Sequence, residues 1–135
     1  MFRLKQQIDF CYGHRLLNYK GKCGQLHGHN ARVEVVLQAE ELNDLGMVVD
    51  FRELKAKLKG WIDATFDHRV ILCERDPVVN VLKELGEPVV VLSENPTAEN
   101  LAKFIFEEVT AMGLPVVEVT FWETDSSSAT YSRSA

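Results

Sequence analysis

Three of the four histidines lie close together near the N-terminus, at His14, His27 and His29. His27 and His29 are two residues apart at the start of a segment that predicts a strand, so their side chains point to the same face, roughly 6.5–7 Å apart. His14 ends an earlier alternating segment, and a hairpin of the two would bring it beside the others. Three imidazoles with a fourth position open are a catalytic zinc arrangement. The alternative is three unrelated surface or loop histidines.

Cys23 lies four residues before His27, in the glycine-flanked loop Gly21-Lys22-Cys23-Gly24. The neighbouring lysine and a nearby cation would favour the thiolate form, so the residue is a candidate for chemistry. It is also a candidate fourth ligand for a closed, structural zinc site. Cys11 and Cys73 lie in apolar stretches and are expected in the core.

Two acidic positions complete the set of candidates. Asp67 and His68 end the first predicted long helix, and a histidine beside an acid often transfers protons near neutral pH. A histidine at a helix C-terminus also interacts favourably with the helix dipole without any catalytic role. Glu123 ends the strand that begins at Val116 and shares its apolar face. The paired N–H donors of a pterin or guanine edge would satisfy a carboxylate there; the alternative is an ordinary surface acid.

The elements that must position these residues alternate along the chain. Alternating or short apolar segments predict strands at 2–13, 29–40, 47–49, 89–92, 116–124 and 129–132. Helices are predicted from the cap Asp50 to Phe66, over 77–85, and from Asn95 to the terminating Gly113. This order predicts an α+β fold with helices on one face of an antiparallel sheet. The other face would be left uncovered, so oligomerisation is expected.

Composition narrows the class of protein. The 135 residues suit one domain, 1–135, and the 46% hydrophobic and 26% charged residues are typical of a globular protein. No apolar run reaches the roughly 18 residues of a membrane span, and the charged N-terminus does not suit a signal peptide. Three cysteines are too few for a disulfide scaffold, so a cytoplasmic location is expected. The net charge of -5 disfavours a nucleic-acid partner.

Together, six segments resemble the 6-pyruvoyl-tetrahydropterin synthase / 6-carboxytetrahydropterin synthase family. They are Phe10-x-x-x-His14, Cys23-Gly-Gln-Leu-His27-Gly-His29-Asn30, Met47-Val-Val-Asp50-Phe51, Phe66-Asp67-His68, Pro96-Thr97-Ala98-Glu99-Asn100, and Glu123-Thr124 followed by Ala129-Thr-Tyr131. They run in order over nearly the whole chain. The resemblance implies a tunnelling fold (T-fold), in which four-stranded antiparallel sheets of several subunits close into a barrel with the helices outside. Two trimers would stack into a homohexamer with active sites between subunits.

The resemblance also implies roles for single residues. The Zn²⁺ ligands would be His14, His27 and His29. The catalytic residues would be Cys23, as general base, with Asp67 and His68 from a neighbouring subunit. The pterin ring would be bound by Glu123 and Thr97. The substrate would be 7,8-dihydroneopterin triphosphate, and candidate cations for its triphosphate are Arg15, Lys20, Lys22 and Arg133.

Two activities share this framework. The compact loops and short chain favour a zinc-dependent lyase that forms 6-carboxy-5,6,7,8-tetrahydropterin with loss of acetaldehyde and triphosphate, on the route to queuosine. The alternative is 6-pyruvoyltetrahydropterin synthase, on the route to tetrahydrobiopterin. A third branch, an aldolase, tends to carry glutamate where this chain has Cys23. From other classes, a non-catalytic domain with structural zinc and a generic zinc hydrolase stay open. The long 76–92 segment departs from the shortest family members.

Overall fold

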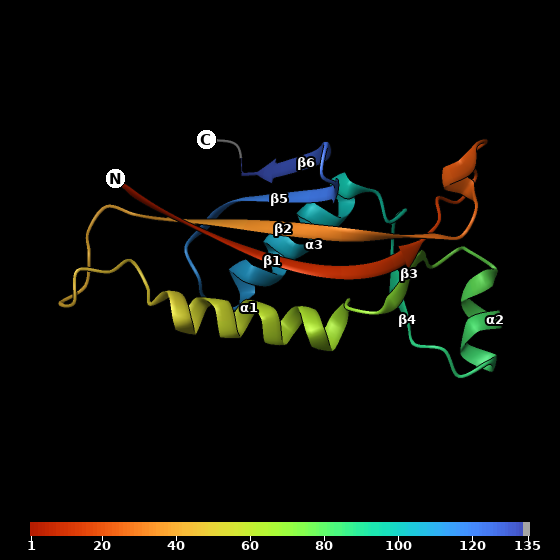
Figure 1. The fold of residues 1–135 in the computed structure, drawn as a ribbon, viewed down its shortest axis with the longest axis horizontal. Coiled ribbons are helices and arrows are strands. Elements are labelled where there is room, and N and C mark those ends of the chain that lie inside the picture. Colours follow the sequence, from red (N-terminus) through yellow and green to blue (C-terminus); the bar gives the residue numbers. More distant parts are fainter. Residues whose placement is uncertain (134–135) are drawn as a thin grey trace.

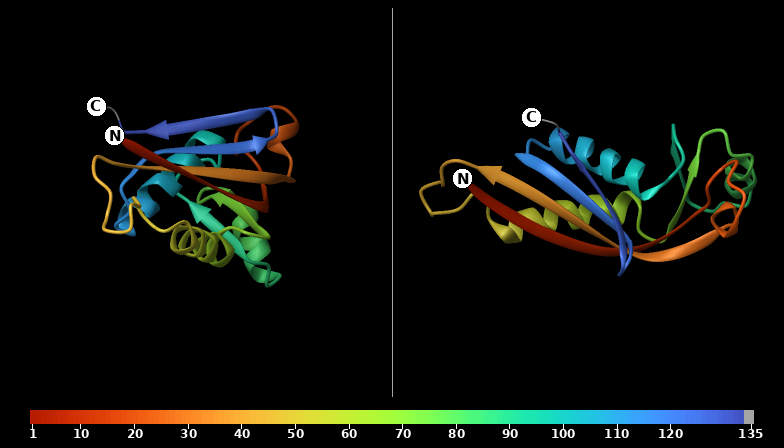
Figure 2. Two further views of the ribbon diagram at one scale, coloured as in Figure 1. Left: turned by 60° about the vertical axis from the view of Figure 1, so that its left-hand side comes forward. Right: turned by 90° about the horizontal axis from the view of Figure 1, so that it is seen from above.

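The computed structural model describes residues 1–133 and is built on one curled sheet (Figures 1 and 2). Its strands are β1 (Phe2–His14), β2 (His27–Ala39), β3 (Arg69–Cys73), β4 (Val89–Leu92), β5 (Val116–Thr124) and β6 (Ser127–Ser132). They lie in the order β4-β3-β1-β2-β5-β6. The β1–β2, β2–β5 and β5–β6 pairs are antiparallel, whereas β3 pairs in parallel with both β1 and β4.

Two long helices, α1 (Phe51–Thr65) and α3 (Ala98–Ala111), cover the same face of the sheet (Figure 2). Each begins at a capping side chain, since Asp50 accepts a hydrogen bond from the Arg52 amide and Thr97 accepts one from the Asn100 amide. The short helix α2 (Val78–Glu84) lies beside β4, and a 3-10 turn, η1 (Lys22–Gly24), lies in the β1–β2 connection.

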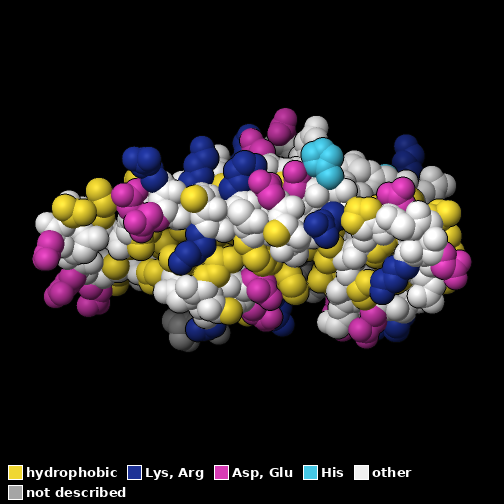
Figure 3. Space-filling view, turned by 90° about the horizontal axis from the view of Figure 1, so that it is seen from below, with side chains coloured by type: hydrophobic (Ala, Val, Ile, Leu, Met, Phe, Trp, Pro, Cys, Tyr) yellow, Lys and Arg dark blue, Asp and Glu magenta, His cyan; other side chains and the backbone are white. Residues whose placement is uncertain are grey.

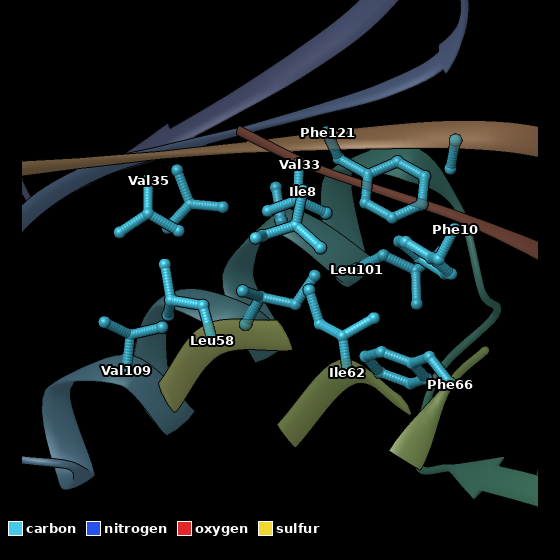
Figure 4. Packing of buried hydrophobic residues seen from close by; sticks show 14 of the residues in the cluster. Ile8, Phe10, Val33, Val35, Leu58, Ile62, Phe66, Leu101, Val109 and Phe121 are labelled. Atoms are coloured by element: carbon cyan, nitrogen blue, oxygen red, sulfur yellow. The ribbon is translucent and has the colours of Figure 1, made fainter. Parts of the chain in front are cut away.

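The core fills the space between this face and the two helices (Figure 4). The sheet contributes Ile8, Phe10, Val33, Val35 and Phe121, and the helical layer contributes Leu58, Ile62, Phe66, Leu101 and Val109. Each is at most 6% exposed, and burying such a side chain stabilises the fold by about 1.5–3 kcal/mol. Because strand residues alternate between faces, this burial fixes which residues of β1 and β2 point toward the helices.

The opposite face of the sheet bears no helix within residues 1–133 and carries Gln7, Asp9, Cys11, Asn30 and Arg32 along β1 and β2. We refer to it as the open face. On the side of the molecule that Figure 3 shows, Lys and Arg side chains are interspersed with Asp and Glu side chains around exposed apolar groups.

The predicted α+β class, with helices on one face, is confirmed, but the sheet has six strands and is mixed rather than four-stranded and antiparallel. The strand β3 was not predicted, because a five-residue segment that pairs with β1 across more than fifty residues leaves no periodic pattern. The strand predicted at 47–49 is wrong. Val48 and Val49 form an irregular segment that packs on the core, so their apolar character reflects burial rather than pairing.

Among the described residues, no helix is both long and apolar enough to cross a membrane.

Candidate active site

The three N-terminal histidines form a cluster at one end of the β1–β2 hairpin. His14, the last residue of β1, pairs with His27, the first residue of β2, while His29 pairs with Tyr12. This register puts all three rings on the helix side of the sheet. Their ring centroids lie 4.6, 4.8 and 5.1 Å apart, and one nitrogen from each ring lies within 4.8 Å of the other two. The structure therefore brings the predicted ligands together.

The hydrogen bonds of this histidine cluster determine which ring nitrogens carry a hydrogen and which present a lone pair. The Nδ1 atoms of His14 and His27 lie 2.7 Å from the carbonyl oxygens of Pro96 and Gln25. A carbonyl only accepts, so both Nδ1 atoms carry a hydrogen, and in the neutral rings both Nε2 atoms, 3.1 Å apart, present lone pairs. Within the described part of the chain, the buried Nε2 of His29 has no hydrogen-bond partner. Imidazoles held at Nδ1 by a backbone carbonyl, as those of His14 and His27 are, are typical of metal ligands.

The donor set fits a zinc ion. Tetrahedral zinc with Zn–N bonds of about 2.0–2.1 Å spaces its nitrogen ligands about 3.3 Å apart, close to the separation of the His14 and His27 Nε2 atoms. Burial lowers the pKa of His14, and the neighbouring histidines lower it further, although the Pro96 carbonyl and Glu123 act in the opposite direction. Burial and His27 also lower the pKa of His29, against the effect of Glu123. Lowered pKa values favour neutral imidazole, the form that binds metal.

The loop that joins the two histidine strands carries Cys23 in the turn η1. Cys23 is half-buried, and its backbone carbonyl accepts a hydrogen bond from the Leu16 amide. A Cβ on Gly24 would clash with the carbonyl oxygen of Tyr19, so only glycine allows the chain to turn directly after Cys23. Asn95 ties the same loop to the start of α3 through two hydrogen bonds to the backbone of Leu17. Cys23 is therefore held in an ordered turn.

The predicted pair Asp67 and His68 lies elsewhere in the chain. The two side chains contact each other, with 3.0 Å between Asp67 Oδ2 and His68 Nδ1, and both line a hollow on the open face with Cys11. Burial raises the pKa of Asp67, but hydrogen bonds from the Cys11 amide and from His68 outweigh this and lower it overall. The structure does not bring this pair to Cys23 within one chain. The expectation that Cys11 is a core residue is wrong, because it follows Phe10 and so points to the open face; Cys73 is buried as expected.

Glu123 and Thr97 line one hollow of about 640 Å³, together with Leu16, Ala98, Glu99 and residues 127–130. Glu123 Oε1 lies 3.4 Å from His29 Nε2, and Thr97 follows Pro96, whose carbonyl binds His14. The hollow therefore adjoins the histidine cluster. Sequence reasoning did not assign Glu99 or residues 127–130 to a site, although Glu99 lies within the Pro-Thr-x-Glu-Asn motif.

Comparison with known proteins agrees with this arrangement. Residues 3–134 match the family described as 6-pyruvoyl tetrahydropterin synthase. The chain belongs to this family. A protein of Rickettsia bellii named 6-carboxy-5,6,7,8-tetrahydropterin synthase is 39% identical over 111 residues, covering 81% of this chain and 80% of the relative. The enzyme of the same name from Aquifex aeolicus is 35% identical, covering 94% of this chain and 87% of the relative.

Solved structures extend the likeness to the whole fold. An uncharacterized protein of Wolinella succinogenes aligns with a TM-score of 0.85 and 28% identity over 98% of both chains. The 6-pyruvoyl tetrahydropterin synthase of Caenorhabditis elegans aligns with a TM-score of 0.73 and 27% identity, over 98% of this chain and 96% of that one. These neighbours confirm the predicted T-fold of the chain, and the family supports the expected pterin synthase-like lyase. The barrel of several subunits stays a prediction.

Among the candidate cations for a triphosphate, Arg15 already forms an ion pair with a carboxylate of its own chain. Its guanidinium makes two hydrogen bonds to Asp76, of 2.7 and 2.5 Å, and the Asp76 side chain is fully buried. Arg133 lies over the ring of Phe106, 5.4 Å from its centroid. Lys20 and Lys22 are exposed on the loop that carries Cys23. The two lysines are thus the candidates that a substrate at this loop would meet first.

Proposed function

We propose that this protein is a zinc-dependent lyase that converts 7,8-dihydroneopterin triphosphate to 6-carboxy-5,6,7,8-tetrahydropterin, with loss of acetaldehyde and triphosphate. The observation that carries the proposal is the convergence of three histidine nitrogens within 4.8 Å, next to a hollow that Glu123 lines. The names of the relatives from Rickettsia bellii and Aquifex aeolicus support the carboxy product and a place on the route to queuosine. Three free cysteines fit a cytoplasmic enzyme.

His14, His27 and His29 would hold the zinc ion. The carbonyls of Pro96 and Gln25, which accept from two of the Nδ1 atoms, would keep the rings oriented without moving on binding. When bound, zinc supplies a Lewis acid that stabilises negative charge on the hydroxyl groups of the substrate side chain.

Glu123 and Thr97 would hold the pterin ring in the hollow beside the zinc ligands. The Glu123 carboxylate is suited to accept two parallel hydrogen bonds from the guanidine-like edge of the ring, which gives orientation as well as affinity. Its 3.4 Å contact with His29 would bring that edge close to the metal ligands. Lys20 and Lys22 would meet the triphosphate, because both are exposed on the adjoining loop.

Cys23 would act as general base and take a proton from the carbon that bears the side-chain hydroxyl. Asp67 and His68 would assist from a neighbouring subunit, since in their own chain they lie on the open face while the His68 side chain is 79% exposed. A homohexamer built as a dimer of trimers would supply that subunit and cover the open face. Each active site would then lie between subunits.

Two other functions make different predictions. A 6-pyruvoyltetrahydropterin synthase is supported by the Caenorhabditis elegans structure, at lower identity than the relatives named for the carboxy enzyme. A non-catalytic domain with a structural zinc site is supported by the position of Cys23 in the loop between two zinc ligands, where it would complete a set of four.

The test is incubation of the zinc-loaded protein with 7,8-dihydroneopterin triphosphate, followed by an assay for acetaldehyde and mass analysis of the pterin. The proposal expects acetaldehyde and the carboxy product in equal amounts. A pyruvoyl product without acetaldehyde would favour the second function. An unchanged substrate, with zinc retained, would favour the structural domain.

A further inference from the structure

A second cluster of ligating side chains lies on the open face, away from the histidine cluster. It consists of Cys11 on β1 and Asp67 and His68 in the turn between α1 and β3. One potential ligand atom from each, a sulfur, a carboxylate oxygen and an imidazole nitrogen, lies within 4.8 Å of the other two. The proposed reaction uses Asp67 and His68 but leaves the thiol of Cys11 without a role.

The backbone holds this Cys11 cluster in place. The Cys11 amide donates to Asp67 Oδ1 at 3.1 Å, and the His68 amide donates to the Cys11 carbonyl at 2.8 Å. His68 has φ of 61°, a left-handed conformation that is uncommon for residues other than glycine. The two hydrogen bonds keep the turn in that conformation and so keep the three side chains together.

The surroundings favour a cation. The cluster lies in a hollow of about 610 Å³ whose lining includes the carboxylates of Asp9, Asp67 and Asp125 and one guanidinium, that of Arg32. Arg32 is itself bonded to Asp9 at 2.9 Å, which leaves two carboxylates unbalanced. Arg69 lines a neighbouring hollow, and Lys59, which is paired with Asp63 at 3.2 Å, also acts on Asp67. With Asp63 included, the four carboxylates outnumber the three cations Arg32, Arg69 and Lys59, and the remaining negative charge favours binding of a cation.

We propose that Cys11, Asp67 and His68 form a second metal site, which takes a thiophilic divalent cation such as zinc or cadmium. Thiolate, imidazole and carboxylate are all ligands of zinc, whereas calcium and magnesium prefer oxygen ligands throughout. Binding replaces the thiol proton of Cys11 with the metal, and the proton goes to solvent. Water completes the coordination.

This site has a consequence that rests on the proposed function. A metal held by Asp67 and His68 removes both from proton transfer, so excess zinc slows turnover. Metal binding itself does not depend on turnover, and it is measured separately.

The experiment titrates Cd²⁺ into protein that already holds one equivalent of zinc, as established by elemental analysis. Cadmium bound to a thiolate absorbs in the ultraviolet, and the band reports sulfur ligation directly. We expect one further equivalent of Cd²⁺ to bind with this band. Cys11→Ser loses the band, while the matched variant Cys23→Ser keeps it.

His68→Asn gives a second, independent check, because asparagine tolerates the left-handed backbone and removes the imidazole. We expect it to keep the band but weaken Cd²⁺ binding by about tenfold or more. Circular dichroism establishes that each variant is folded. A band that persists in Cys11→Ser, that vanishes in Cys23→Ser, or that is absent from the wild-type protein overturns the proposal. None of these results bears on the acetaldehyde assay, so the two proposals fail separately.

Discussion

The two clusters of ligating side chains lie on opposite faces of the sheet and are held in different ways. In the histidine cluster, His14 is 2% exposed and two rings are oriented by backbone carbonyls. In the Cys11 cluster, the His68 side chain is 79% exposed and its ring contacts only the carboxylate of Asp67 among the ligating groups. A buried, oriented donor set needs little ordering when a metal arrives, whereas an exposed one must be ordered on binding. The comparison predicts a tight site on the helix side and a weaker one on the open face.

The largest effect is expected from removing a histidine of the histidine cluster. His14→Ala removes one of the three proposed zinc ligands, so zinc content is expected to fall from about one per chain to near none, and turnover to the background rate. Elemental analysis and the acetaldehyde assay measure the two. The matched variant His68→Asn changes a histidine on the open face and is expected to keep the first zinc. Loss of zinc in both variants would contradict the separation of the two clusters.

Replacing the loop thiol separates chemistry from metal binding. Cys23→Ala is expected to keep zinc and lose about 10²–10⁴-fold in turnover, the usual contribution of a general base. Elemental analysis alongside single-turnover kinetics measures both quantities. Should Cys23→Ala release the metal and unfold, Cys23 would be a fourth ligand and the structural-zinc function would be correct.

Two ion pairs that differ in burial, Arg15–Asp76 and Asp9–Arg32, are expected to differ in their contribution to the free energy of unfolding. Asp76→Asn breaks the ion pair between the buried Asp76 and the partly exposed Arg15, and the free energy of unfolding is expected to fall by about 2 kcal/mol. Asp9→Asn breaks the exposed pair with Arg32 on the open face and is expected to leave stability unchanged. Urea denaturation of both variants at neutral pH measures the difference. Equal losses would mean that burial does not distinguish the two pairs.

The same buried pair predicts a pH dependence with a definite sign. The hydrogen bonds from Arg15 hold the pKa of Asp76 below its usual range. The ionised carboxylate therefore stabilises the folded chain fully above the unfolded-state pKa of about 3.9, and this stabilisation is lost as the pH falls through the lower folded-state value. The gap between wild type and Asp76→Asn in urea should be constant from pH 7 to 5 and narrow below about pH 4. A gap that widens in acid would contradict the assignment.

The smallest effects come from the two helix caps. Asp50→Ala and Thr97→Ala each remove a side chain that accepts from a helix amide, and each is expected to cost about 1 kcal/mol of stability. Only Thr97 lines the hollow beside Glu123, so only its variant should also raise KM. Thr97→Ser keeps the capping hydroxyl and should restore stability. A raised KM in Asp50→Ala would indicate that capping, rather than contact with substrate, controls binding.

The sequence predicts the histidine cluster well and the Cys11 cluster poorly. His27 and His29 share a face by strand spacing alone, and the hairpin that adds His14 is a local structure. Cys11 was predicted in the core because its neighbours are apolar, yet its position directly after Phe10 turns it to the other face. Its meeting with Asp67 depends on β3, a short strand that pairs in parallel with a distant part of the chain. Sequence spacing carries no signal for such a pairing.

What the sequence alone determined is the α+β class, the three histidines on one side of a hairpin, the caps of the long helices and the family to which the chain belongs. These depend on spacing between neighbours in the chain, which strand and helix periods translate directly into direction. Only the tertiary structure decided that the carbonyl of Pro96 orients His14, that Asp76 occupies Arg15, and that Cys11 meets Asp67 and His68. Each of these contacts joins residues more than fifty positions apart, and packing of the whole core, rather than any local pattern, sets the distance between them.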